Sequence, residues 1–209
     1  MRKDPTREEE KETTKIQEQL PDRLRIGVTC VPTFLLNGQR FIILTPLPLE
    51  DFDPSPKRER IITIGENKTH HTTLTEGMLC VPSGAHDSPE GTPDIKLESS
   101  MLREIKEELG IELKLERLKP FPITHFVEQY RSDGIFNSPN APVMSTLFVV
   151  TGFTYELTEA EFAELQLSAR RLRVSIITLP VQEALGFENT AVRPATIAAI
   201  QAYASLLRK

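Results

Sequence analysis

The sequence predicts an α/β fold in which a mixed β-sheet lies between helices. From Leu24 onward the chain contains short apolar runs rich in Val, Ile, Phe and Thr, a composition typical of strands. Three well-separated helix candidates interrupt these runs, and strands interleaved with helices indicate a sheet covered on both faces. The 209 residues, of which 39% are apolar, can bury one substantial core. We therefore expect one domain over residues 22–209.

The first 21 residues form a charged extension. They are rich in Glu, Lys and Thr with few apolar anchors, as in a solvated helix or a disordered tail. They resemble no apolar export segment, and no stretch of the chain reaches about 18 uninterrupted apolar residues. The net charge of -5 and the lack of a long Lys/Arg run argue against a nucleic-acid polymer as partner. We expect a cytoplasmic protein that makes no membrane contact.

The first half of the domain reads as strands. The segments "RIGVTCVPTFLL" and "RFIILTPL" flank Asn37 and Gly38, a pair that favours the tight turn of a β-hairpin. Two further strands are expected at "ERIITIG" and "HTTLTEGMLCVP". Cys30 and Cys80 lie in such apolar runs without metal-binding spacing, so we expect buried thiols rather than a disulfide.

A helix is expected over residues 93–109, after a polar loop. Thr92 is a suitable N-cap, Pro93 suits the first helical position, and Gly110 suits the left-handed residue that ends a helix. Beyond it we expect a strand over residues 142–157, a helix over 159–171, a strand over 173–180 and a C-terminal helix within 190–209.

The helix before Gly110 carries an unusual group of carboxylates. Met101, Leu102, Ile105 and Leu109 form one apolar stripe that must face the core. On the rest of the helix lie Glu104, Glu107 and Glu108 at i, i+3 and i+4, where like charges repel by about 0.2–0.5 kcal/mol per pair. Spacing alone leaves two interpretations open: a solvated acidic surface, or a site for a hard cation such as Mg²⁺, which takes carboxylate ligands.

The segment "REIKEELGI", Arg103 to Ile111, distinguishes the two. It resembles the end of the Nudix hydrolase signature, which reads Arg-Glu-apolar-any-Glu-Glu-any-Gly-apolar, in the expected order of strand, loop and helix. The preceding "VPSG" resembles the family's Pro-Gly-Gly, with Ser83 replacing the first glycine. The resemblance is specific over about thirty residues, and it implies a Nudix-like α/β/α sandwich.

The resemblance also implies a site and a reaction. Glu104, Glu107 and Glu108 would be ligands of Mg²⁺ or Mn²⁺, the carbonyl oxygen of Gly84 would complete the metal's coordination, and Arg103 would hold a carboxylate in place. The reaction would be hydrolysis of a diphosphate linkage in a small-molecule nucleotide, a nucleoside diphosphate joined to a second group. Which nucleotide is the substrate stays open, as do its binding residues. A homodimer is a hypothesis taken from the family's habit.

Two features depart from the family pattern. Gly84 lies nineteen residues before Arg103 instead of fourteen, and Ile95 stands where an acid is usual, which an insertion of about five residues explains. Glu90 or Glu98 could replace that acid. The general base can come from the signature helix or from a later segment. By its placement in "TEAEFAEL" we choose Glu161 over Glu159 and Glu164. His86, in the inserted loop, is either a phosphate contact or an ordinary surface residue.

Two other functions remain as alternatives. The lengthened loop could leave a catalytically weak or inactive nucleotide-binding module, which metal-dependent turnover would distinguish. Isomerase chemistry on a diphosphate lipid precursor would require a catalytic cysteine beside the pocket, for which Cys80 is the candidate.

Overall fold

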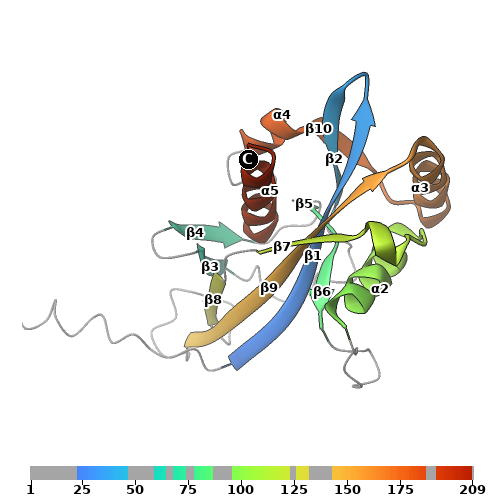
Figure 1. Cartoon of the computed structure of the whole chain (residues 1–209). Helices are drawn as coiled ribbons and strands as arrows, with labels where there is room; N and C mark the ends of the chain where they lie inside the picture. The colour runs from blue at the N-terminus through green and yellow to red at the C-terminus, as the bar shows by residue number, and fades with distance from the viewer. Residues whose placement is uncertain are drawn as a thin grey trace, which may run out of the picture.

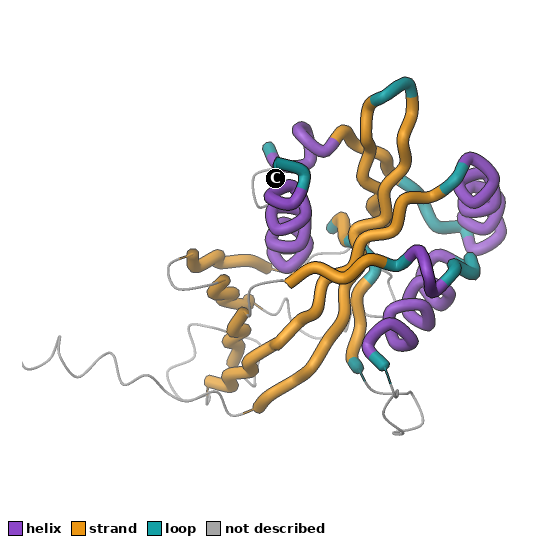
Figure 2. The backbone as a smooth tube through the Cα atoms, in the orientation of Figure 1, coloured by secondary structure: helices purple, strands orange, loops and turns teal. Residues whose placement is uncertain are grey.

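The computed structural model describes residues 23–46, 59–64, 68–73, 78–86, 96–122, 126–131, 143–186 and 192–208. The charged extension predicted over residues 1–21 lies outside these ranges. Within them a mixed sheet runs through the centre of the molecule, with helices on both sides (Figures 1 and 2). The α/β class predicted from the sequence is therefore confirmed.

The main path of the sheet has the order β10-β2-β1-β9-β8-β3-β4, and β5, β6 and β7 pair with β2, β1 and β9. The long central pair β1 and β9 is parallel, whereas the other named strand pairs are antiparallel. The strand bounds are Arg23–Leu36 for β1, Gln39–Pro46 for β2, Glu59–Ile64 for β3, Lys68–Thr73 for β4, Leu79–Cys80 for β5, Ser83–Ala85 for β6, Lys119–Pro122 for β7, Phe126–Arg131 for β8, Val143–Leu157 for β9 and Ile177–Pro180 for β10.

The helices form the two outer layers. Their bounds are Leu97–Leu109 for α2, Glu159–Leu172 for α3, Val181–Leu185 for α4 and Pro194–Leu206 for α5, and a short 3-10 turn, η2, spans Leu115–Arg117. Helices α2 and α3 pack with β1 and β9 in one apolar cluster, and α4 and α5 pack with β1 and β2 in another. Alternation along β1 explains the division, because Cys30 joins the first cluster and Val31 the second.

The predicted hairpin is present. Asn37 and Gly38 have φ values of 50° and 78°, which are the left-handed conformations that a two-residue hairpin turn requires. β1 and β2 pair on either side of them, with Leu36 opposite Gln39.

The sequence interpretation differs from the structure at several elements. The strand predicted over residues 173–180 begins only at Ile177. The strand predicted over "HTTLTEGMLCVP" is wrong as one element, because β4 pairs with β3 while β5 pairs with β2, at separate places in the sheet. The short helix α4 was not predicted, and its five residues are too few for a clear periodic pattern.

None of the helices in the described ranges has the length and apolar character needed to cross a membrane.

Candidate active site

Helix α2 holds Glu104 and Glu108 beside its apolar stripe, next to strand β6, and Glu107 on its exposed side. Met101, Ile105 and Leu109 are buried against the sheet, as the periodicity predicts. Gly110 ends the helix with φ 66° and ψ 24°, and its N–H donates to the carbonyl of Lys106. The predicted start at Pro93 is wrong, because Lys96 is extended (φ -135°, ψ 143°) and the first helical residue is Leu97. Thr92 and Pro93 themselves lie outside the described residues.

Gly84 lies directly against the carboxylate of Glu104. Strand β6, which contains Gly84, pairs with β1 in antiparallel register so that Gly84 is opposite Val28, a residue of the cluster beneath α2. A Cβ added at Gly84 would overlap the carboxyl group of Glu104. The φ of Gly84 is not positive, so glycine is needed here for space rather than for backbone conformation. The structure thus joins two residues that lie twenty positions apart in the sequence.

The remaining signature residues surround this contact. The backbone N–H of Ser83 donates to Glu108 Oε1 at 3.2 Å. Arg103 Nη1 lies 2.8 Å from Glu104 Oε1 and 3.2 Å from Glu107 Oε2. The Glu104 side chain is 12% exposed, whereas that of Glu107 is 51% exposed. One carboxylate is therefore enclosed between strand and helix, and a second is open to solvent beside it.

The donor set suits a hard divalent cation. The Glu104 carboxylate lies against Gly84, and Glu108 accepts a hydrogen bond from the adjacent Ser83; carboxylate and carbonyl oxygens are the donors that Mg²⁺ prefers. The missing Cβ of Gly84 leaves the carboxylate in contact with the main chain. In the described ranges, no three Asp, Glu, His or Cys side chains already converge on one metal position; the positive charge beside Glu104 and Glu107 is the guanidinium of Arg103.

Glu161, the predicted general base, has structural partners. It accepts hydrogen bonds from Arg117 Nη1 at 2.7 and 2.8 Å and from the hydroxyl of Tyr155 at 2.7 Å. It also forms a capping box with Thr158 at the start of α3. Burial raises the pKa of Glu161, but hydrogen bonds from the Thr158 backbone, Tyr155, Arg117 and the Thr158 hydroxyl outweigh it and hold the pKa at about 2. A carboxylate so stabilised is a weak proton acceptor at neutral pH. Its partners Arg117, Tyr155 and Thr158 all follow Gly110 in the chain.

The structure locates three of the four other acids that were considered from the sequence. Glu98 lies in the first turn of α2, six residues before Glu104 and hence on a different face of the helix. Glu90 lies outside the described residues. Glu159 and Glu164 are exposed on α3.

His86 is better fixed than a surface loop residue. Its Nδ1 lies 2.8 Å from the hydroxyl oxygen of Ser100 on α2, and Ser100 is completely buried. Sequence reasoning missed Ser100. The signal was a serine four residues before Glu104, a spacing that places both on one face of the helix.

The cysteines are buried, as predicted. Cys30 and Cys80 are free thiols with exposed fractions of 0% and 3%, and burial raises the pKa of Cys30. Cys80 Sγ donates to the carbonyl oxygen of Thr45 at 3.4 Å. A thiol enclosed in this way disfavours the isomerase alternative, which needs it beside a substrate.

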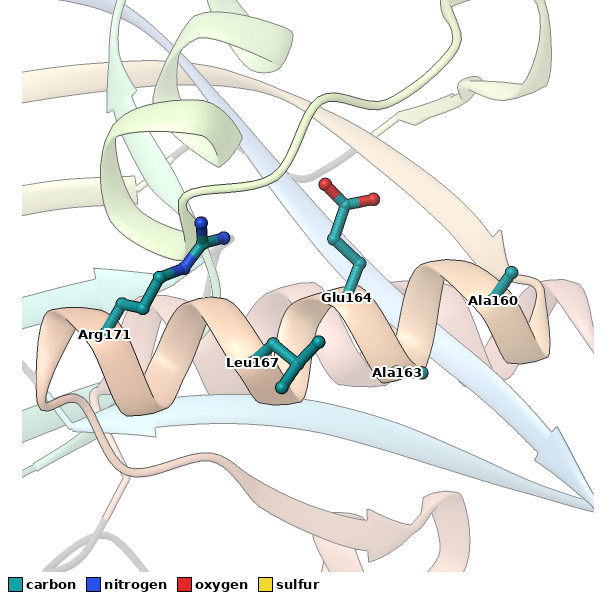
Figure 3. Close-up of a pocket in the computed structure, with 5 residues that line it drawn as sticks. All are labelled: Ala160, Ala163, Glu164, Leu167 and Arg171. Carbon is teal, nitrogen blue, oxygen red and sulfur yellow. The ribbon is translucent and has the colours of Figure 1, made fainter.

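An open surface hollow lies on helix α3. Figure 3 shows its lining, which comes from α3 alone: Ala160, Ala163, Glu164, Leu167 and Arg171. None of the five belongs to the signature. The hollow brings no carboxylates together, so we do not place the active site there.

Among known proteins, the chain is similar in fold to several solved structures. No protein-family model matches the chain, and no curated protein matches it. Among solved structures, the chain resembles a mutT/nudix family protein from Listeria innocua, with 17% identity, a TM-score of 0.49 and coverage of 91% of this chain and 96% of that one.

Two further structures are similar. The NUDIX domain of Shewanella oneidensis NrtR complexed with ADP ribose has 12% identity, a TM-score of 0.44 and coverage of 97% and 99% of the two chains. The MutT protein from Methanosarcina mazei Go1 has 15% identity, a TM-score of 0.42 and coverage of 91% and 100%.

Proposed function

We propose that this protein is a Nudix-type hydrolase that cleaves a diphosphate linkage in a nucleoside diphosphate joined to another group, with Mg²⁺ as cofactor. The observation that carries the proposal is the contact between Gly84 and Glu104, with Ser83 donating to Glu108 beside it. This contact joins the two halves of the motif in space despite the insertion. An acidic surface selected for solvation alone has no need of a glycine packed against one of its carboxylates.

Each residue has a role in this proposal. The carbonyl of Gly84 and the carboxylates of Glu104, Glu107 and Glu108 would hold the cation. When bound, a divalent cation neutralises phosphate oxygens and lowers the pKa of an attacking water. Arg103 fixes Glu104 and Glu107 through its two short ion pairs, which limits the rotamers that these carboxylates adopt.

The carboxylate that orients the water is assigned to Glu107 rather than to Glu161. Glu107 is half exposed beside Arg103, so its oxygens can accept a hydrogen bond from a solvent molecule. Glu161 already accepts five hydrogen bonds from Arg117, Tyr155 and Thr158. Its low pKa also weakens it as a base.

The test is nucleotide or phosphate release from a panel of nucleoside diphosphate sugars, dinucleotides, ADP-ribose and nucleoside triphosphates, with and without Mg²⁺. We expect metal-dependent release that falls roughly 100-fold or more in Glu104→Gln and Glu107→Gln. Glu112→Gln is the matched control, because Glu112 is an exposed acid just after the helix that pairs with Lys106. It should retain wild-type release.

Two results would contradict the hydrolase. Equal release by Glu107→Gln and Glu112→Gln would exclude the signature carboxylates from the reaction. Metal-dependent binding of a panel nucleotide without any release would favour the alternative function, a nucleotide-binding module.

A further inference from the structure

His86 is fixed through both its backbone and its side chain. Its backbone N–H donates to the carbonyl of Ile26 at 3.0 Å, which extends the ladder between β1 and β6 by one residue beyond Ala85. Its Nδ1 lies 2.8 Å from Ser100 Oγ. Ser100 is fully buried while His86 is partly exposed. The ring is therefore anchored at Nδ1 in a residue that is itself only partly buried.

This anchored ring lies on the same side as the carboxylates. In an extended segment, residues two apart point to the same face, so His86 points as Gly84 does, toward α2. Ser100 and Glu104 are four residues apart on α2 and follow one another on one face, with Cβ atoms about 5–6 Å apart. The strand and the helix thus make two successive contacts, Gly84 with Glu104 and His86 with Ser100.

The free ring nitrogen has the right chemistry for phosphate. If the Ser100 hydroxyl donates to Nδ1, the neutral imidazole carries its proton on Nε2. Nε2 is across the ring from Ser100, and an N–H group there can donate to an anionic oxygen. A phosphate oxygen is a strong acceptor for such a donor.

From these contacts we propose that His86 is a substrate-binding residue, which donates a hydrogen bond from Nε2 to a phosphate oxygen of the diphosphate held next to Glu104. Ser100 orients the ring. This assignment rests on the proposed function, since it places the diphosphate at the metal-binding carboxylates. It competes with a purely structural role, in which His86 ties β6 to α2 and keeps Gly84 over Glu104.

The experiment separates the two nitrogens of the ring. His86→Asn keeps an amide near the position of Nδ1, within reach of Ser100, and removes the group at Nε2. Calorimetry measures binding of methylenediphosphonate, a non-hydrolysable diphosphate without a base, to the full chain in Mg²⁺. Mn²⁺ binding without diphosphonate is measured by electron paramagnetic resonance.

We expect His86→Asn to weaken diphosphonate binding about 10-fold, as for one lost charge-assisted hydrogen bond, with Mn²⁺ affinity unchanged. Ser100→Ala should weaken diphosphonate binding in the same direction. Ser99→Ala is the matched control, because Ser99 is the exposed neighbour of Ser100, and it should bind as the wild type does.

A second pair of variants does not depend on the Ser100 contact. The amide of Gln reaches the position of Nε2, so His86→Gln should bind the diphosphonate more tightly than His86→Ala. This comparison stands even where His86→Asn fails to fold.

Several results would overturn the assignment. Diphosphonate binding by His86→Asn within twofold of wild type would do so, as would equal losses of diphosphonate and Mn²⁺ affinity, which indicate the structural role. A wild-type chain that binds Mn²⁺ but not the diphosphonate overturns the role of His86 and leaves the metal site standing. A chain that binds neither overturns the proposed function as well.

Discussion

At the scale of the residue, Gly84 shows how a missing side chain shapes this site. Its backbone approaches the Glu104 carboxylate so closely that a methyl group would overlap it. The overlapping atoms are the far end of a flexible side chain, so a larger residue would displace Glu104 rather than break the fold. Gly110 differs, because its φ of 66° and its contact with Ser168 make glycine necessary for the backbone itself.

Gly84→Ala should therefore weaken metal binding without unfolding the protein. The added methyl group displaces the Glu104 carboxylate from its place against Gly84, and we expect Mn²⁺ affinity to fall about 10-fold or more. The free energy of unfolding should fall by less than about 1 kcal/mol, because Glu104 can turn toward solvent. Metal titration and urea denaturation measure the two quantities.

Ser83→Ala is the control for this prediction, since it keeps the N–H that Ser83 gives to Glu108. Unchanged metal affinity in Gly84→Ala would mean that the contact of Gly84 with Glu104 has no part in the site.

At the scale of the element, Glu161 connects three segments. Its capping box begins α3, its bonds to Arg117 reach η2, and its bond to Tyr155 reaches β9. The guanidinium of Arg117 also stacks over the Tyr155 ring, 4.6 Å from its centroid, and Arg117 donates to the carbonyl of Glu156. These contacts fix the loop between α2 and β7 against α3.

Glu161→Gln should destabilise the fold in a pH-dependent way. The pKa of Glu161 is about 2, below the usual 4.5, so its stabilisation is complete above about pH 4.5 and is lost as the pH falls through 2. We expect the variant to be less stable by about 1–2 kcal/mol at pH 7. The difference from wild type should shrink at pH 3.

Urea denaturation at pH 7, 4.5 and 3 tests this. Glu159→Gln serves as control, because Glu159 lies in the same first turn of α3 but is exposed. A difference between wild type and Glu161→Gln that is the same at all three pH values would be against the expected role.

At the scale of the whole molecule, the fold depends on two apolar clusters, one on each face of the sheet. Cys30 lies within the cluster beneath α2 and α3, and Cys80 is buried on β5, next to Thr45 on β2. Reaching either thiol requires separation of packed elements.

Thiol labelling should consequently report unfolding. In native buffer, a thiol-reactive dye should label neither cysteine within minutes, since both are enclosed and burial raises the pKa of Cys30. In denaturant two thiols should react per chain. Rapid labelling of Cys80 in the native protein would return the isomerase alternative to consideration, and Cys80→Ala would then test its part in turnover.

Local patterns in the sequence determined much of the architecture. The hairpin followed from Asn37 and Gly38, and the buried face of α2 from the spacing of Met101, Ile105 and Leu109. The end of α2 at Gly110 also followed from the residues. These features depend on a few neighbouring residues, whose turn chemistry and periodicity act over short range.

The tertiary structure determined which distant segments come into contact and how those contacts change their side chains. Glu161 was predicted as a base from its place in the chain, but Arg117 and Tyr155 give it a low pKa and structural contacts. The signature specified which carboxylates to consider, while the packing of β6 on α2 brought Gly84 to Glu104 and His86 to Ser100. No local pattern encodes such pairs, because they arise when strand register and helix packing place segments in contact.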